Sequence, residues 1–308
     1  KEPTLLNFIC ERVREACVSS PIGCRVYASF QIALVSDILD SSSKAKESVV
    51  RVVMPYVLRG VRSNNPTPYQ NCSRVLLLRL VSEGLSKQQA KRAIVEIALN
   101  TDKNNTSDAA MCVVAIAASS SSSSVLDDND DETMDYVSKM PQLASQLSLA
   151  ADRFDISALL KNLVPSLASK CCFEKETQGF ETLKTLIREA RLSTGLESQL
   201  SPFVSSVVKN IVTNNKVKKK LTKIHRKRIE TLVRDLNETF PVETERVVCS
   251  LVVVSEENDK DTVTSVIRDT LSRDVSERHI LRGVVRSKTN SIITLRDAIH
   301  ESSDLETR

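Results

Sequence analysis

The residues with the clearest chemical character in this chain are basic and closely spaced. Residues 216–228 read KVKKKLTKIHRKR, with no acidic residue and eight cationic side chains: Lys216, Lys218, Lys219, Lys220, Lys223, Arg226, Lys227 and Arg228. Cations of this kind neutralise phosphates, and each neutralised phosphate releases a counterion. The cluster therefore predicts a surface that binds a polyanion.

The apolar residues around this cluster recur at helical spacing, which predicts an amphipathic helix over 217–238. Val217, Leu221 and Ile224, followed by Leu232 and Leu236, would form its buried stripe, and the basic residues would decorate the exposed side. Like charges at i,i+4 repel by a few tenths of a kcal/mol each, so a polyanionic partner would relieve strain.

Four explanations of the cluster remain open: an RNA or other phosphate backbone, an acidic protein neighbour, a nuclear or nucleolar import signal, and a solvated helix face. The net charge of +4 is too small to decide among them. No aromatic residue interleaves the cluster, so stacking on exposed bases is not expected.

Motifs for catalysis and for metal or cofactor binding are missing from the sequence. There is no GxSxG, phosphate-binding glycine loop, HExxH or CxxC, and the histidines are His225, His279 and His300. We expect no enzyme activity, no cofactor, no metal site and no small-molecule substrate. The eight cysteines are expected to be reduced core thiols of an intracellular protein.

The amino-acid composition indicates which type of secondary structure carries the basic cluster. Aromatic residues make up only 4% of the chain, and it has six glycines. β-Sandwiches, barrels and dinucleotide-binding domains need glycine in their turns and phosphate loops. The sequence therefore predicts an all-α protein.

Three prolines interrupt aliphatic runs: Pro55, Pro165 and Pro202. A proline inside a helix removes a backbone donor and bends the helix, and a bent first helix is typical of HEAT pairs. A chain of 308 residues is also long for one core, whereas a solenoid packs each repeat only on its neighbours. The prediction is a HEAT-like α-solenoid of stacked antiparallel helix pairs with irregular repeats.

The periodicity predicts the helices as segments separated by short breaks. The expected segments lie near 4–19, from 21 to 41, 46–61, 69–83, 86–99, 107–118, 133–150, 156–172, 177–194, 196–213, 217–238, 244–256, 260–272, 275–285 and 291–301. Ser86 with Gln89 reads as a capping box, and Asp155 as an N-terminal cap. No apolar run approaches the ~20 residues that cross a bilayer, so no membrane association is expected.

The Ser-rich and acidic stretch 119–132 predicts a flexible loop, because it cannot bury enough surface to offset its ordering entropy. It would separate the halves 1–118 and 133–308 of a single solenoid. That solenoid, residues 1–308, is expected to be a segment of a larger protein, because its first residue is Lys within a helix already in progress.

Three segments together resemble one family of helical proteins. They are Asn7–Cys10, Met54–Val61 (MPYVLRGV), and Asp155–Leu160 (DISALL) followed by Val164–Leu167 (VPSL). Their order and approximate spacing resemble the amino-terminal region of the U3 small-nucleolar-RNA-associated protein ten family, also called HEAT repeat-containing protein one. The resemblance covers most of residues 4–215, and residues 119–132 and 216–228 are not part of it.

The resemblance implies a non-catalytic scaffold in the nucleolus, within the nucleus. Its partners would be proteins of a U3-associated subcomplex, with WD-repeat propellers and helical domains, and the 5′ external transcribed spacer of pre-rRNA. Its function would be assembly of the small-subunit processome and pre-18S rRNA processing, linked to rDNA transcription. The rival interpretation is a karyopherin-like or other HEAT-repeat adaptor that binds protein partners.

Overall fold

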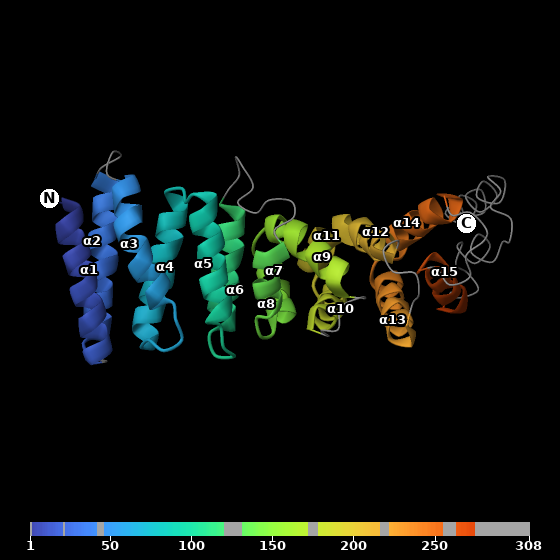
Figure 1. Ribbon diagram of the computed structural model, residues 1–308, viewed down its shortest axis with the longest axis horizontal. Coiled ribbons are helices and arrows are strands. Elements are labelled where there is room, and N and C mark those ends of the chain that lie inside the picture. Colours follow the sequence, from blue (N-terminus) through green and yellow to red (C-terminus); the bar gives the residue numbers. More distant parts are fainter. Residues whose placement is uncertain are drawn as a thin grey trace. The chain divides into compact units, whose positions relative to one another are not determined.

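The computed structural model describes residues 2–20, 22–41, 46–119, 131–171, 178–215, 222–254 and 263–274. Every regular element in these ranges is a helix, and no strand occurs in them. The helices pack in series on neighbours in the chain (Figure 1). The all-α, solenoid-like fold expected from composition and periodicity is therefore confirmed.

The chain divides into two compact units, residues 1–150 with 154–162, and residues 151–153 with 163–308. The first unit contains α1 (Glu2–Ser19), α2 (Cys24–Ser41), α3 (Lys46–Gly60), α4 (Thr67–Ser82), α5 (Lys87–Leu99), α6 (Thr106–Ala118), α7 (Asp131–Ser138) and α8 (Leu143–Ala151). The division falls within α9 (Ser157–Cys171), whose residues up to Asn162 belong to the first unit and whose residues from Leu163 belong to the second.

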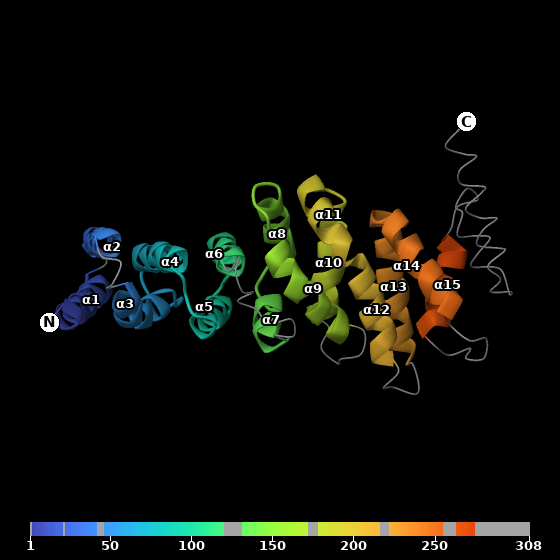
Figure 2. The same ribbon diagram turned by 90° about the horizontal axis from the view of Figure 1, so that it is seen from above.

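The first unit is built from two rows of helices. α1 packs on α3 and α3 on α5, while α2 packs on α4 and α4 on α6. Contacts between α1 and α2, α3 and α4, and α5 and α6 join the rows. The arrangement is visible in Figure 2, where α1, α3 and α5 lie in one row and α2, α4 and α6 in the other. Within α1 to α6, alternate helices thus pack side by side in a row, and the pairs α1–α2, α3–α4 and α5–α6 join the two rows, which is the packing of stacked helix pairs.

Local sequence signals account for the helix boundaries in this unit. Ser86 accepts a hydrogen bond from the Gln89 backbone, and the Gln89 side chain accepts one from the Ser86 backbone N–H. This confirms the expected capping box. Pro55 lies inside α3 as predicted, and Val53 beside it is completely buried. Asp155 accepts a hydrogen bond from the Ser157 backbone N–H at 2.9 Å, so it caps α9 as expected.

The second unit is arranged around one helix. Its further elements are α10 (Gln178–Ala190), α11 (Thr194–Leu200), the short 3₁₀ turn η1 (Ser201–Phe203), α12 (Val204–Asn215), α13 (Lys223–Thr239), α14 (Pro241–Val254) and α15 (Val263–Asp274). α13 contacts α10, α12, α14 and α15. The helix that carries part of the basic cluster is therefore packed against four other helices of this unit.

Two segments that were each expected to form one continuous helix are divided in the structure. The segment 133–150 is split into α7 and α8 by a turn that contains Pro141 and Gln142, and Gln142 adopts a left-handed φ of 51°. The segment 196–213 is split by η1, which contains Pro202. Proline lacks the N–H that continues a helical hydrogen-bond ladder, and here it breaks the helix instead of bending it.

The predicted loop 119–132 is too long at both ends. Ser119 caps the end of α6, and Asp131 and Glu132 form the first turn of α7, where carboxylates interact favourably with the helix dipole. Residues 120–130 lie outside the described residues, so the flexible loop stays a prediction. The predicted helices 275–285 and 291–301 also lie outside the described residues.

Candidate functional site

The basic cluster is described from Thr222 onward. The Thr222 side chain accepts a hydrogen bond from the His225 backbone N–H at 3.3 Å and so caps α13, which begins at Lys223. The prediction that this helix starts at Val217 is therefore wrong. Lys223, Arg226, Lys227 and Arg228 lie in its first two turns. The other four members of the predicted site, Lys216, Lys218, Lys219 and Lys220, lie outside the described residues.

The buried stripe of α13 places these cations on its outer side. Ile229, Leu232, Val233 and Leu236 are buried, and they recur at the three- and four-residue spacing of one helix face. Ile224 was expected on this stripe but is 65% exposed. The stripe continues toward the amino terminus through position 225, so position 224 is turned away from it.

The position of the buried stripe on α13 determines how exposed each basic residue is. Lys223, Arg226 and Lys227 are exposed and Arg228 is half-buried. The first turn of α13 contains no acidic residue, and the first acid of the helix is Glu230. The amino-terminal end of a helix carries a partial positive charge, so these cations add to a potential that already attracts anions.

An aromatic residue of α10 contacts the basic surface, and no local pattern in the sequence predicts this contact. The Arg228 guanidinium lies over the Phe180 ring at 5.6 Å from its centre, and the Lys184 ammonium lies 5.3 Å from the same centre. Phe180 is buried, so its ring positions Arg228 through a cation–π contact. It is not an exposed platform for bases.

The carboxyl-terminal half of α13 has a different electrostatic character. Asp235 is buried and accepts hydrogen bonds from Arg188 of α10, from Nε at 3.0 Å and from Nη2 at 3.3 Å. Arg191, in the turn that follows α10, pairs with Glu238 at 2.6 Å and donates to the Thr239 hydroxyl at 2.8 Å. In this half, the arginines at the end of α10 and in the turn after it are matched by acids of α13.

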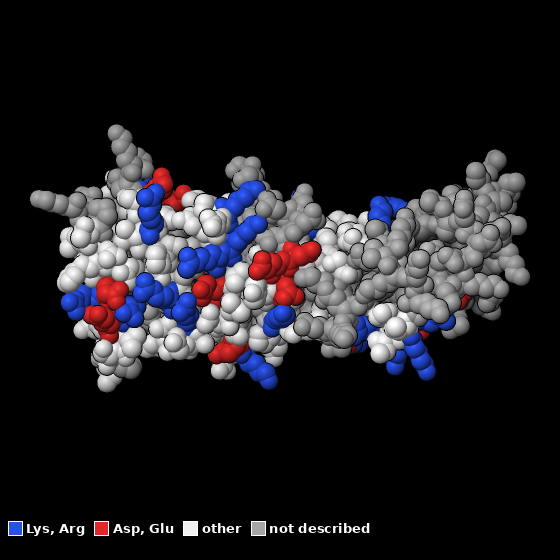
Figure 3. All heavy atoms as spheres, viewed as in Figure 1, with Lys and Arg blue, Asp and Glu red and all other residues white. Residues whose placement is uncertain are grey.

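The surface of the second unit is therefore electrostatically divided. Figure 3 shows Lys and Arg side chains at the lower edge of the region where α10 and α13 lie in Figure 1. The first two turns of α13 carry four cations and no acid, whereas the later turns carry paired acids. We define the basic surface as Lys223, Arg226, Lys227 and Arg228. It can hold phosphates, and it offers no nucleophile or metal ligand set.

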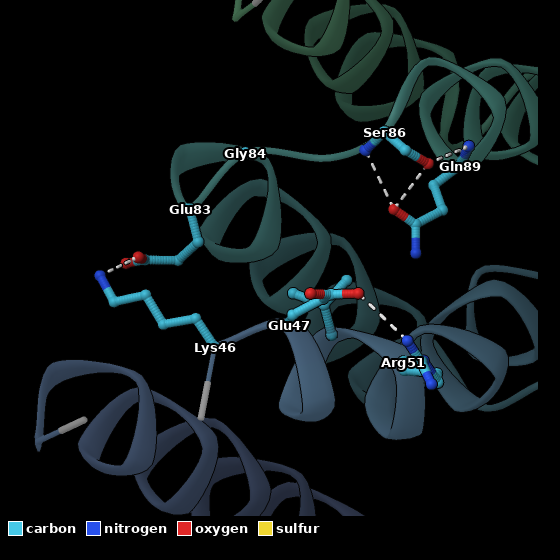
Figure 4. Close-up of a pocket in the computed structure, with 8 residues that line it drawn as sticks. Lys46, Glu47, Arg51, Glu83, Gly84, Ser86 and Gln89 are labelled. Carbon is cyan, nitrogen blue, oxygen red and sulfur yellow. Dashed lines mark hydrogen bonds and ion pairs between the residues drawn. The ribbon is translucent and has the colours of Figure 1, made fainter. Parts of the chain in front are cut away.

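A cleft in the first unit is a second place where polar groups gather. It has a volume of about 470 Å³ and lies between the start of α3 and the α4–α5 connection (Figure 4). Its lining residues are Lys46, Glu47, Val50, Arg51, Glu83, Gly84, Ser86 and Gln89. Gly84 has φ +93°, a left-handed conformation that favours glycine and turns the chain from α4 toward α5.

The charged side chains of this cleft neutralise one another. Lys46 donates a hydrogen bond to Glu83, and this bond holds the pKa of the Glu83 carboxyl below its ordinary value. Arg51 donates to Glu47 at 3.1 Å. Arg79 lies 3.0 Å from Glu83 on its other oxygen. The cleft is thus a joint at which the Lys46–Glu83 ion pair connects the start of α3 to the end of α4.

Neither a metal site nor a membrane-spanning helix occurs among the residues that the structure describes. No group of three or more His, Cys, Asp or Glu side chains within the described ranges could hold a metal ion. His225 lies on α13, while His279 and His300 lie outside these ranges. No described helix is long and apolar enough to span a membrane.

The cysteines that can be described are all in the core of the first unit. They are Cys10, Cys17, Cys24, Cys72 and Cys112, and each is buried and free of disulfide bonds. Burial raises the pKa of Cys17 and of Cys72 to about 12. Their burial confirms the expected core position, and these thiols are protonated at neutral pH.

Comparison of the chain with protein-family models finds no match. Comparison with curated proteins also finds no match.

Proposed function

We propose that this chain is a non-catalytic helical scaffold of nucleolar ribosome biogenesis that contacts pre-rRNA through the basic surface of α13. The observation that carries the proposal is the concentration of four cations, without an acid, on the outer side of two helical turns. Phosphate contacts of this kind give affinity that depends on salt and little on sequence.

The packing of the second unit supports a rigid presentation of these cations. α13 contacts four other helices, and its buried stripe fixes which side faces outward. Arg228 is held against the Phe180 ring. A surface on a helix packed in this way needs little ordering when it binds an extended polyanion.

The cellular setting rests on the resemblance of residues 4–215 to the U3 small-nucleolar-RNA-associated protein ten family. It suggests assembly of the small-subunit processome, with partners among WD-repeat propellers and helical domains. The Lys46–Glu83 ion pair of the cleft agrees with a scaffold, because it joins the start of α3 to the end of α4.

Binding of a fluorescent single-stranded RNA of 20 nucleotides to the full chain, measured at 50 and 200 mM salt, tests the proposal. The variant K223E/R226E/K227E is expected to bind at least tenfold more weakly than wild type at 50 mM salt. The matched control reverses three exposed cations of the first unit, Arg25, Arg92 and Lys103. Both variants have the same net charge.

The control is expected to retain most of the affinity, because only the basic surface is proposed to contact RNA. Equal loss in both variants would show a response to net charge alone and would overturn the proposal. Tighter binding to an acidic peptide such as poly-glutamate than to RNA would instead identify an acidic protein as the partner and would also overturn it.

A further inference from the structure

Thr222 places an exposed hydroxyl at the edge of the basic surface. It immediately precedes Lys223, the first residue of α13, and its backbone is extended, with φ −76° and ψ 160°. Thr222 is exposed to solvent. Its hydroxyl oxygen accepts the His225 backbone N–H at 3.3 Å, so the hydroxyl proton takes no part in this bond. A hydroxyl that is exposed on extended backbone can be reached by an enzyme that modifies it.

The sequence around Thr222 has the charge pattern of a substrate for a kinase that selects basic residues. Lys218, Lys219 and Lys220 stand four, three and two positions before it, and Lys223 follows it. No acidic residue occurs within six positions on either side. Kinases distinguish their substrates by charge patterns of this kind. The pattern therefore favours a kinase directed to basic sequences over one directed to acidic sequences.

Thr231 in the same helix shows which feature distinguishes Thr222. Thr231 also follows basic residues, because Lys227 and Arg228 stand four and three positions before it. However, it lies inside α13, is half-buried, and its hydroxyl donates to the Lys227 carbonyl at 2.9 Å. The catalytic carboxylate of a kinase must accept the proton of the acceptor hydroxyl. At Thr231 the helix already holds that proton, so of these two residues Thr222 is the one available in the folded chain.

A phosphate on Thr222 would lie beside cations of the basic surface. The Arg226 backbone N–H donates to the Thr222 carbonyl at 3.0 Å, which places the two residues one helical turn apart. Side chains of a helix lean toward its amino terminus, so the Arg226 side chain leans toward Thr222. Phosphothreonine carries a charge of about −1.5 to −2 at neutral pH. It would offset up to about half of the charge of the four cations and compete with an RNA phosphate for them.

From these observations we infer that Thr222 is a phosphorylation site for a protein kinase directed to basic sequences, and that its phosphate prevents the basic surface of α13 from binding RNA. The Thr222 oxygen attacks the γ-phosphorus of a nucleoside triphosphate, and the bond from that phosphorus to the β-phosphate oxygen breaks. The nucleoside diphosphate leaves, and the hydroxyl proton passes to the kinase carboxylate. Control of RNA binding rests on the function proposed above, whereas the modification of Thr222 does not.

The modification is tested by incubating the folded full chain with ATP and the catalytic subunit of a cyclic-AMP-dependent protein kinase, which selects basic sequences. Mass spectrometry is expected to find phosphate on Thr222 and not on Thr231. Thr222→Asn is the matched control, because Asn also caps helices but offers no hydroxyl. Phosphate on Thr231 instead of Thr222, or an unmodified Thr222 while the kinase phosphorylates a standard basic peptide, would overturn the inference.

Phosphorus NMR tests whether the phosphate contacts the basic surface, without any RNA. Nearby cations favour the dianion of a phosphate. The second pKa of the phosphate is therefore expected to be lower in the phosphorylated wild type than in the phosphorylated variant K223Q/R226Q. Equal pKa values in the two proteins would show that the phosphate lies away from these cations and would overturn the inference.

RNA binding separates control by phosphate from the proposed function itself. At the lower salt concentration, the phosphorylated chain is expected to bind the same RNA at least about fivefold more weakly than the unphosphorylated chain, because fewer cations remain to neutralise RNA phosphates. Thr222→Asp should bind more weakly than Thr222→Asn, since both residues cap helices and Asp alone adds a charge.

The two possible failures have different signatures. Equal binding by the phosphorylated and unphosphorylated chains would overturn control by phosphate and leave the proposed function intact. An unphosphorylated chain that binds no RNA would overturn the proposed function and the control that rests on it. In that case phosphate on Thr222 and its lowered pKa would still support the modification.

Discussion

The ion pairs between α10 and α13 allow a quantitative test of how the second unit is held together. Asp235 is buried, and Arg188 binds both of its oxygens, at 3.0 and 3.3 Å. Asp235→Asn keeps the shape of the side chain but removes its charge. A hydrogen bond to a charged group contributes about 1.5–3 kcal/mol. Because the Arg188 side chain is 53% exposed, solvent screening reduces this contribution. We therefore expect the free energy of unfolding to fall by about 1–2 kcal/mol.

Urea unfolding followed by circular dichroism measures this loss, and hydrogen exchange locates it. In Asp235→Asn, faster exchange is expected in α10 and α13, because these are the helices that the pair joins. Glu238→Gln is the control, since Glu238 is 48% exposed and the pair it makes contributes at most about 1 kcal/mol. An Asp235→Asn variant with the urea midpoint of wild type and unchanged exchange would refute this account of the α10–α13 contact.

Three further outcomes are expected in the first unit. Val53→Asp places a charge at a completely buried position and should cost at least about 3 kcal/mol; a thermal melt like that of wild type would contradict the assigned core. The hydrogen bond from Lys46 lowers the pKa of the Glu83 carboxyl below its ordinary value. The stability that this ion pair contributes is therefore fully present above the ordinary pKa of a glutamate, and it is lost as the pH falls through the lowered pKa of Glu83. The stability difference between wild type and Glu83→Gln should therefore shrink from pH 7 to pH 3, and a constant difference would disprove the linkage. Because the pKa of Cys17 and of Cys72 is raised to about 12 by burial, a thiol-reactive disulfide reagent at pH 7 should label them only after unfolding; rapid labelling of the folded chain would show that they are accessible.

Local signals in the sequence were sufficient for much of the fold. The capping box at Ser86 and Gln89 and the cap at Asp155 depend on residues two or three positions apart, so they could be predicted without knowledge of packing. The helical prolines Pro55 and Pro165 were also placed within helices as expected. The same signal failed at Pro202, where a proline in a similar aliphatic context lies in a 3₁₀ turn.

The candidate site was predicted less completely because its contacts are long-range. The basic residues of α13 are evident from composition, but the contact of Arg228 with Phe180 joins residues of two different helices. The pairing of Asp235 with Arg188 also depends on how α10 packs against α13. The predicted start of α13 at Val217 is wrong because the aliphatic spacing continues across Thr222, a residue type that favours helix caps.

The salt dependence of RNA binding is the most direct test of the claim that the basic surface of α13 neutralises phosphates. For single strands, the logarithm of the binding constant falls with the logarithm of salt concentration by about 0.7 per neutralised phosphate. The variant R226A/K227A should therefore show a slope shallower than that of wild type by about 1.4 if each residue contacts one phosphate. An unchanged slope, with RNA still bound, would contradict the claim.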